Sequence, residues 1–318
     1  MTNGIWHNDK FWEDYEPGGI SNEEIESKIA EFTEIINQSK AIINEVSYNI
    51  DQCVADVIDD QLVFITVLNN DMSIVVYIED EELLIPGKEI KVKSEIIQGN
   101  LLAKNVKANL LVSGELNLTT EENDIFKING ELSNNNQIYN VSMIISEDLI
   151  GAGTTKLELK GNEAFLSGEL GINSYCQIKN LIENHPEVKT LIFTKVPGSV
   201  YDDVNMHIGR LIRKGGLITK ALFSSKIYSG GVDLFCSGKE RIVHKGAELG
   251  VHSWDDGDKT AIDYPMDHPA HSLQIEYFEQ MLGEKNGKSF YYFTIVSAKA
   301  DDIYIMSHEE IRKWKIST

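Results

Sequence analysis

The chain has 318 residues and a formal net charge of −21, with 50 Asp and Glu against 29 Lys and Arg. This length suits two domains, each able to bury a core of its own. The acidic balance argues against a nucleic-acid partner and against an anionic membrane surface, because both require clustered lysine and arginine. No apolar run approaches the roughly 18 residues that mark a membrane-spanning helix, so no membrane span is expected.

The three cysteines, Cys53, Cys176 and Cys236, stand far apart in apolar surroundings. They show neither metal-ligand spacing nor an even-numbered disulfide framework, so we expect three buried thiols. The first residues contain no basic segment followed by an apolar one, which predicts no signal peptide and a cytoplasmic location for the chain as written. The polar, aromatic start is also typical of a mature exported protein, and a periplasmic or extracytoplasmic location is the alternative for a processed form.

Residues 1–60 hold 14 Asp and Glu and three Lys, a charge of −11. Aromatic residues among these acids predict an arm that docks on another surface; they are Trp6, Phe11, Trp12 and Tyr15. Ser21 and Glu24 then form a capping-box pattern. From Ile25 to Val46, apolar residues recur at alternating steps of four and three, which predicts one long amphipathic helix. We expect this helix to lie on a sheet, with a subunit contact as the alternative.

From about residue 50 to residue 160 the pattern changes to short apolar runs between Asn, Asp and Gly. Strands are predicted at residues 61–68, 72–78, 89–92, 108–112, 125–128 and 139–145. The first two runs flank Asn69-Asn70-Asp71, which is a hairpin signal. This β-rich module contains no recognisable chemistry. The glycines near residue 151 mark the boundary between an N-terminal domain, residues 1–155, and a second domain, residues 156–318.

The second half alternates between strand-like and helix-like segments, which is typical of an α/β fold. Strands are predicted at residues 164–168, 188–194 and 290–296, and helices at 174–183, 202–214, 269–282 and 309–314. Between them, Ser229-Gly230-Gly231 opens a helix-sized apolar segment. A buried strand, Leu249-Gly250-Val251, then ends on His252. Reactive groups of α/β folds are presented at the ends of such elements.

Ser229 and His252 are therefore the candidate catalytic pair. A serine hydroxyl becomes a nucleophile when a base takes its proton and a third group orients that base. A helix that begins just after Ser229 would also favour a developing oxyanion. The alternative for Ser229 is an ordinary helix cap, and the alternative for His252 is a structural histidine. Ser224, Ser225 and Ser237 are expected to be structural, with Ser237 capping the end of the helix.

Ser229, Gly238, Arg241 and Leu249-Gly250-Val251-His252 resemble the core of the ClpP-like serine peptidases of the crotonase superfamily, closest to an extracytoplasmic bacterial branch. The resemblance covers residues 160–318. It implies a crotonase-like ββα spiral, here preceded by an acidic helical and β-rich N-terminal domain. It also implies a peptidase that cleaves peptide bonds by a Ser-His-Asp acyl-enzyme mechanism. Such a protein would act on a peptide or protein substrate, need no cofactor or metal, and form a homo-oligomer.

The same resemblance assigns further site residues. Gly198 and Gly230 would supply the two oxyanion-hole N–H groups, although Pro197 replaces the family's first glycine. Asp302 would be the third member of the triad, with Asp301 and Asp263 as alternatives. Some related peptidases use a lysine base instead, and the candidates here are Lys226, Lys239 and Lys245. Two other functions are compatible with this half of the chain: a non-catalytic crotonase-like scaffold or binding module for a protein partner, and a coenzyme A enzyme of the wider superfamily.

Overall fold

The computed structural model divides the chain into two units. One contains residues 29–152, and the other contains residues 153–318 together with the N-terminal stretch up to Lys28. The residues that the structure describes are 5–7, 10–12, 22–58, 61–79, 84–102, 107–121, 125–146 and 148–318. No helix in these ranges is both long and apolar enough to cross a membrane. The sequence placed the domain boundary at residues 155/156; the observed division falls at residues 152/153.

The long helix predicted up to Val46 is shorter in the structure. Helix α1 (Asn22–Gln38) ends before β3 (Lys40–Ile43), and Val46 begins β4 (Val46–Ile58). Asn44 and Glu45 have positive φ angles of 49° and 67°, which a tight hairpin turn requires. The expectation was wrong here because Ile42, Ile43 and Val46 favour strands, and the turn lets them pair. The predicted cap at Ser21 and the aromatic side chains of the arm lie outside the described residues. Two short backbone segments of the arm are described, strands β1 (Ile5–His7) and β2 (Lys10–Trp12).

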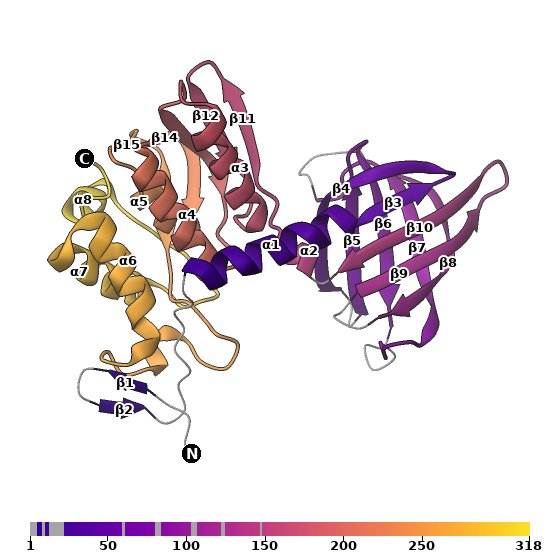
Figure 1. Cartoon of the computed structure of the whole chain (residues 1–318), viewed down its shortest axis with the longest axis horizontal. Helices are drawn as coiled ribbons and strands as arrows, with labels where there is room; N and C mark the ends of the chain where they lie inside the picture. Colours follow the sequence, from indigo (N-terminus) through magenta and orange to yellow (C-terminus); the bar gives the residue numbers. More distant parts are fainter. Residues whose placement is uncertain are drawn as a thin grey trace. The chain divides into compact units, whose positions relative to one another are not determined.

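The unit of residues 29–152 is a closed antiparallel barrel in the order β10-β3-β4-β5-β6-β7-β8-β9 (Figure 1). Besides β3 and β4, its strands are β5 (Gln61–Leu68), β6 (Met72–Ile78), β7 (Glu89–Gln98), β8 (Asn109–Thr120), β9 (Ile125–Ser133) and β10 (Ile138–Ser146). Alternate residues of each strand point inward, as Tyr139, Val141 and Met143 do in β10. The six predicted strands are confirmed; their closure into a barrel was not predicted.

The C-terminal unit contains a seven-stranded mixed sheet, which confirms the predicted α/β class. Its order is β11-β12-β13-β14-β16-β17, with β15 also paired to β14. The bounds are β11 (Lys156–Lys160), β12 (Glu163–Ser167), β13 (Thr190–Val196), β14 (Ile218–Tyr228), β15 (Arg241–Val243), β16 (Glu248–Val251) and β17 (Tyr304–Ile305). Strands β12, β13, β14 and β16 run parallel, and the two outermost strands are antiparallel to their neighbours.

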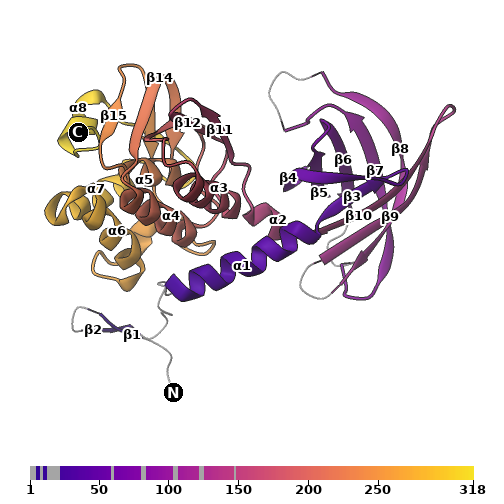
Figure 2. The same cartoon turned by 45° about the horizontal axis from the view of Figure 1, so that its top comes forward.

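Helices α3 (Ile172–Asn184), α4 (Asp202–Gly215) and α5 (Gly230–Cys236) lie on one face of this sheet (Figure 2). Helix α6 (Ser272–Leu282) follows, and α8 (His308–Lys313) closes the chain with the expected cap at Ser307. The strand predicted at residues 290–296 was wrong, because this run lies inside α7 (Glu284–Ser297). Phe290, Tyr291, Thr294 and Ile295 are buried at helical spacing there, so packing overrides the β preference of these residue types.

The start of α1 belongs to the C-terminal unit. It was predicted to belong to the N-terminal domain. The Glu26 carboxylate accepts a hydrogen bond from the Tyr175 hydroxyl at 2.6 Å and lies 3.1 Å from Nε2 of His207. Lys28 Nζ lies 3.5 Å from the Asp203 carboxylate. These contacts join α1 to α3 and α4, so the structure does not show an acidic N-terminal domain as one body.

The cysteines differ in exposure, against the expectation of three buried thiols. Cys53 in the barrel and Cys236 in α5 are buried, whereas Cys176 in α3 is partly exposed. Burial raises the pKa of the Cys53 thiol to about 11 and raises that of Cys236 still further. A thiol with a raised pKa holds little of the reactive thiolate at neutral pH.

We predict that iodoacetamide at pH 8 will modify native protein at Cys176 well before the other two cysteines. At a pKa near 11, only about 0.1% of the Cys53 thiol is ionised at pH 8. Peptide mass spectrometry over a time course measures each site, and the protein in denaturant is the control in which all three should react at similar rates. Equally fast modification of Cys53 or Cys236 in native protein would contradict this packing.

Candidate active site

Three candidate residues follow the carboxyl ends of neighbouring strands. Gly198 follows β13, Ser229 follows β14 and His252 follows β16, with β14 in the middle. The Ser229 N–H donates to the carbonyl oxygen of Gly250 at 2.9 Å, which extends the pairing of β14 with β16. Because the carboxyl ends of adjacent parallel strands meet at one edge of a sheet, the fold brings the three residues to one place.

Ser229 has an unusual backbone conformation. Its φ and ψ angles are 51° and −130°, and helix α5 begins at the next residue. Residues other than glycine rarely adopt a positive φ, and such outliers cluster at functional sites, where the surrounding structure maintains the strain. Ser229 makes no side-chain capping hydrogen bond to α5. This geometry removes the ordinary explanation of Ser229 as a helix cap and leaves its hydroxyl for another role.

The glycines around Ser229 are required by close packing. A Cβ atom on Gly230 would lie 2.0 Å from the Ser199 hydroxyl, and one on Gly231 would lie 2.8 Å from a methyl group of Val196. A Cβ on Gly198 would approach the Ser229 hydroxyl at 3.7 Å, so the backbone of Gly198 lies beside the candidate nucleophile. The structure thus brings Gly198 and Gly230 together around Ser229.

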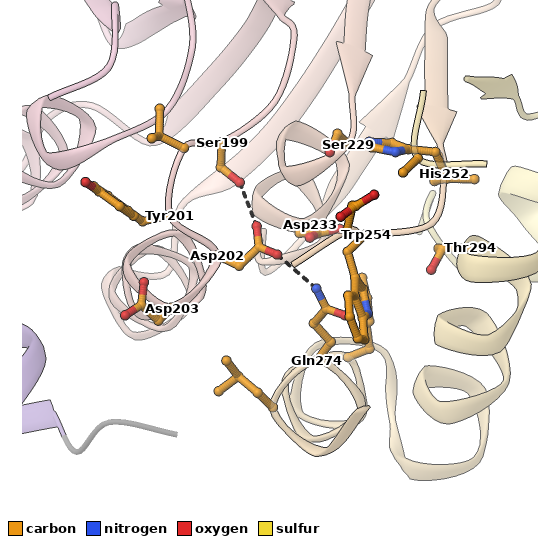
Figure 3. Close-up of a pocket in the computed structure, with 16 residues that line it drawn as sticks. Ser199, Tyr201, Asp202, Asp203, Ser229, Asp233, His252, Trp254, Gln274 and Thr294 are labelled. Atoms are coloured by element: carbon orange, nitrogen blue, oxygen red, sulfur yellow. Dashed lines mark hydrogen bonds between the residues drawn. The ribbon is translucent and has the colours of Figure 1, made fainter. Parts of the chain in front are cut away.

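His252 lines the same cavity as Ser229, and Figure 3 shows its ring turned toward Ser229. Its Nδ1 atom is buried and has no hydrogen-bond partner in the described part of the chain. Nε2 is therefore the ring nitrogen that can accept or donate a proton in the cavity. The described residues show no hydrogen bond between the two side chains, and such contacts are often long before a substrate binds.

The structure does not bring Asp302 to His252. The Asp302 side chain is exposed, and one of its oxygens accepts a hydrogen bond from the N–H of Ile303. Asp301 and Asp302 line a different hollow from the one that holds Ser229. Asp263 caps a short 3-10 helix by accepting from Thr260. Within the described residues, none of the three predicted carboxylates hydrogen-bonds to His252.

A carboxylate that the sequence analysis missed, Asp202, lies in the cavity of about 540 Å³ that holds Ser229 and His252. Its two oxygens accept hydrogen bonds of 3.0 Å from the Ser199 hydroxyl and from the Gln274 amide (Figure 3). Burial raises the pKa of Asp202, and the two hydrogen bonds and the nearby His252 oppose that rise. Asp202 therefore lies in the same cavity as His252, with both its oxygens already hydrogen-bonded.

Asp233 is a second unexpected carboxylate in the cavity lining. It lies in the first turn of α5, one turn after Ser229. Burial, together with the neighbouring Asp202, raises the pKa of Asp233 well above its usual range. The sequence signal for both residues was an acid in the first turn of a helix, which also fits a simple interaction with the helix dipole. Only the folded structure shows that both carboxylates line the cavity, beyond any interaction with a helix dipole.

The remaining motif residues have structural roles. Arg241 is buried and donates to the carbonyl oxygens of Gly238 and Lys315, which ties the end of α5 to the chain's C-terminal segment. Ser225 and Ser237 donate to main-chain carbonyls, as expected for structural serines. Lys226 lies 3.1 Å from Glu248, and none of the three candidate lysines, Lys226, Lys239 and Lys245, lines the cavity with Ser229.

Among the described residues, no group of three or more His, Cys, Asp or Glu side chains is arranged to hold a metal ion.

An aromatic network fixes the cavity wall next to His252. Trp254 lines the cavity and donates to the Tyr291 hydroxyl at 2.9 Å, and that hydroxyl also hydrogen-bonds to the His271 ring. The indole of Trp254 is held in place by these contacts.

No family model and no curated protein matches this sequence. Similar solved structures include an enoyl-CoA hydratase from Bacillus anthracis, with a TM-score of 0.34 and 10% identity, covering 51% of this chain and 68% of that one. Another is an enoyl-CoA hydratase/carnithine racemase from Magnetospirillum magneticum, with a TM-score of 0.35 and 15% identity, covering 51% and 66%. These neighbours are crotonase-superfamily proteins, but such values are too low to transfer a fold or an activity. The resemblance to ClpP-like peptidases therefore rests on the sequence motif alone.

We predict that Ser229→Gly will be more stable than Ser229→Ala by about 1–2 kcal/mol, because glycine alone adopts the observed φ of 51° without strain. Chemical denaturation of the two variants measures the difference in the free energy of unfolding. The matched control is the same pair at Ser253, a buried serine whose φ is not positive, where glycine should be the less stable. Equal stability of the two Ser229 variants would show that the turn is not strained.

We predict that Asp233→Asn will gain stability relative to the natural protein as the pH rises. The folded state raises the pKa of Asp233, so the folded protein holds this proton more tightly than the unfolded chain. Stability from this group is complete below the ordinary aspartate pKa of about 4 and is lost as the pH rises toward the folded pKa. Thermal midpoints from pH 4 to pH 8 test this, with the exposed Asp258→Asn as control. A difference that is constant across this range would contradict the buried position of Asp233.

Proposed function

We propose that this chain is a serine hydrolase that cleaves peptide bonds through an acyl-enzyme on Ser229. The observation that carries the proposal is the strained backbone of Ser229, which holds a serine without a capping role at the end of a central strand. Strain of about 1–3 kcal/mol persists where the surrounding structure maintains it, and a nucleophile on a sharp strand-to-helix turn is one reason for it. The shared cavity with His252 supports the same function.

In the proposed reaction, the Ser229 hydroxyl attacks the substrate carbonyl carbon while Nε2 of His252 takes the hydroxyl proton. The N–H groups of Gly198 and Gly230 would hold the oxyanion. His252 then gives the proton to the leaving amine as the carbon–nitrogen bond breaks, and the acyl group stays on Ser229. Water attacks this ester and passes a proton to His252, and the carbon–oxygen bond to Ser229 breaks as the serine regains its proton.

Asp202 takes, in this proposal, the electrostatic part of the role that the resemblance gave to Asp302. Asp202 lies in the same cavity as His252, so an ionised Asp202 would stabilise the imidazolium that forms when Ser229 loses its proton. Asp202 does not hydrogen-bond to His252 in the described residues, so it would stabilise charge rather than fix the ring's tautomer. Self-association of the chain, which the resemblance implies, stays a prediction.

The alternative function is a non-catalytic scaffold or a module that binds a protein partner. One observation favours it: Nδ1 of His252 is buried without an acceptor among the described residues, whereas an activated catalytic histidine is normally oriented through that atom. Pro197 before Gly198 also restricts the loop that would form the oxyanion hole. The two functions differ in whether Ser229 reacts.

The proposal predicts that a fluorophosphonate probe labels Ser229. The serine oxygen bonds to phosphorus as the phosphorus–fluorine bond breaks, and the proton leaves with fluoride. Ser229→Ala should abolish labelling, and His252→Ala should slow it by roughly 10²–10⁴ because the general base is lost. Ser199→Ala, which removes a second hydroxyl from the same cavity, should still be labelled at Ser229. Labelling that persists in Ser229→Ala, or an unreactive natural protein, would favour the scaffold.

A further inference from the structure

Among the described residues, the lining of the cavity around Ser229 and His252 contains four acids and no lysine or arginine. The lining acids are Asp202, Asp203, Asp233 and Asp255. Charges of one sign in a confined cavity of about 540 Å³ raise the local concentration of ligands of the opposite sign. The aromatic rings of Tyr201 and Trp254 belong to the same lining, and such ring faces also attract cations.

Two acceptors of this lining lack a hydrogen-bond donor. No described group donates to the Asp233 carboxylate, although the hydroxyl of Tyr277 donates to the main-chain carbonyl of the same residue. The Oε1 atom of Gln274 is buried and is likewise without a donor among the described residues. An unpaired buried acceptor such as Gln274 Oε1 is unfavourable, and the partly exposed Asp233 carboxylate lines the cavity. A ligand that carries several N–H groups and a positive charge would supply what this wall lacks.

The chain's own lysine shows that this lining accepts an ammonium group. Nζ of Lys28 lies 3.5 Å from the Asp203 carboxylate and 4.3 Å from the centre of the Tyr201 ring. Asp203 and Tyr201 both belong to the cavity lining. One part of the lining therefore already binds a cation by a carboxylate and an aromatic face, while in the described part of the chain no lysine or arginine pairs with Asp233.

We propose that the cavity selects substrates that carry a cationic side chain, that of lysine or arginine, next to the bond to be cleaved, and that Asp233 is the specificity-determining residue. The inference rests on the proposed serine hydrolase function and adds its substrate class. Asp233 stands one helical turn after Ser229, so a side chain bound to it belongs to a residue close to the reacting carbonyl. Asp202 already accepts hydrogen bonds from Ser199 and Gln274 and keeps its proposed role beside His252.

Three fluorophosphonate probes test the proposal, alike except that a six-carbon chain ends in an ammonium, a methyl or a carboxylate group. The ammonium probe should label Ser229 at least about tenfold faster than the methyl probe, because a bound ammonium would favour the ionised form of Asp233 and form a charge-assisted hydrogen bond with it. The carboxylate probe should be the slowest. Each rate is divided by the rate of hydrolysis of that probe in buffer, and the labelled residue is identified by mass spectrometry.

Asp233→Asn should reduce the preference for the ammonium probe to about twofold or less while Ser229 remains reactive toward the methyl probe. Asp258→Asn, an exposed aspartate outside the lining, should keep the full preference. If Asp233→Asn does not fold, a stepwise rise in salt on the natural protein tests whether the preference is electrostatic, because screening must weaken the ammonium preference and leave the methyl probe's rate unchanged.

The outcomes separate this inference from the function beneath it. Ser229 labelled equally fast by all three probes, or fastest by the carboxylate probe, would overturn the cationic preference and leave the serine hydrolase intact. Labelling by none of the probes would overturn both. A preference that survives in Asp233→Asn would move the specificity to another lining acid and overturn the role of Asp233.

Discussion

The parallel pairing of β14 with β13 and β16 is the constraint on which the candidate site depends. It places the carboxyl ends of β13, β14 and β16 at one edge of the sheet, where Gly198, Ser229 and His252 begin the following segments. The hydrogen bond from the Ser229 N–H to Gly250 carries this pairing up to the turn itself. Any change that shifts the register of β14 against β16 would separate the serine from the histidine.

Several features at this edge of the sheet lower the stability of the fold. In the described part of the chain, Ser229 holds a strained backbone, Oε1 of Gln274 is buried without a donor, and Nδ1 of His252 is buried without a partner. Each feature is unfavourable by itself, since strained residues and unpaired buried groups destabilise a fold by about 1–3 kcal/mol. Elsewhere in this unit Arg241 satisfies the main-chain carbonyls beyond the end of α5. A strained serine beside two unsatisfied polar atoms in one cavity fits a binding or catalytic site.

Local patterns in the sequence predicted much of this fold. Short apolar runs located six of the eight barrel strands, but closure depends on pairing β10 with β3, whose residues Val141 and Ile43 are far apart in the sequence. Helical spacing from Ile25 to Val46 was mistaken for one helix because a hairpin can satisfy the same apolar residues. Ser229 and His252 were predicted because they stand at element ends. Asp202 and Asp233 were missed because only the folded structure brings the first turns of two helices to the same cavity.

The central claim, that Ser229 carries the acyl group of a cleaved peptide, is tested most directly in water enriched in ¹⁸O. A digest of unrelated proteins is incubated with the chain, and new peptide C-termini are identified by mass spectrometry. Hydrolysis through an ester on Ser229 places one ¹⁸O in each new C-terminus, and these peptides should be missing when Ser229→Ala replaces the natural protein, because loss of such a serine lowers kcat by about 10⁶. No new C-termini with the natural protein, or the same C-termini with Ser229→Ala, would contradict the account.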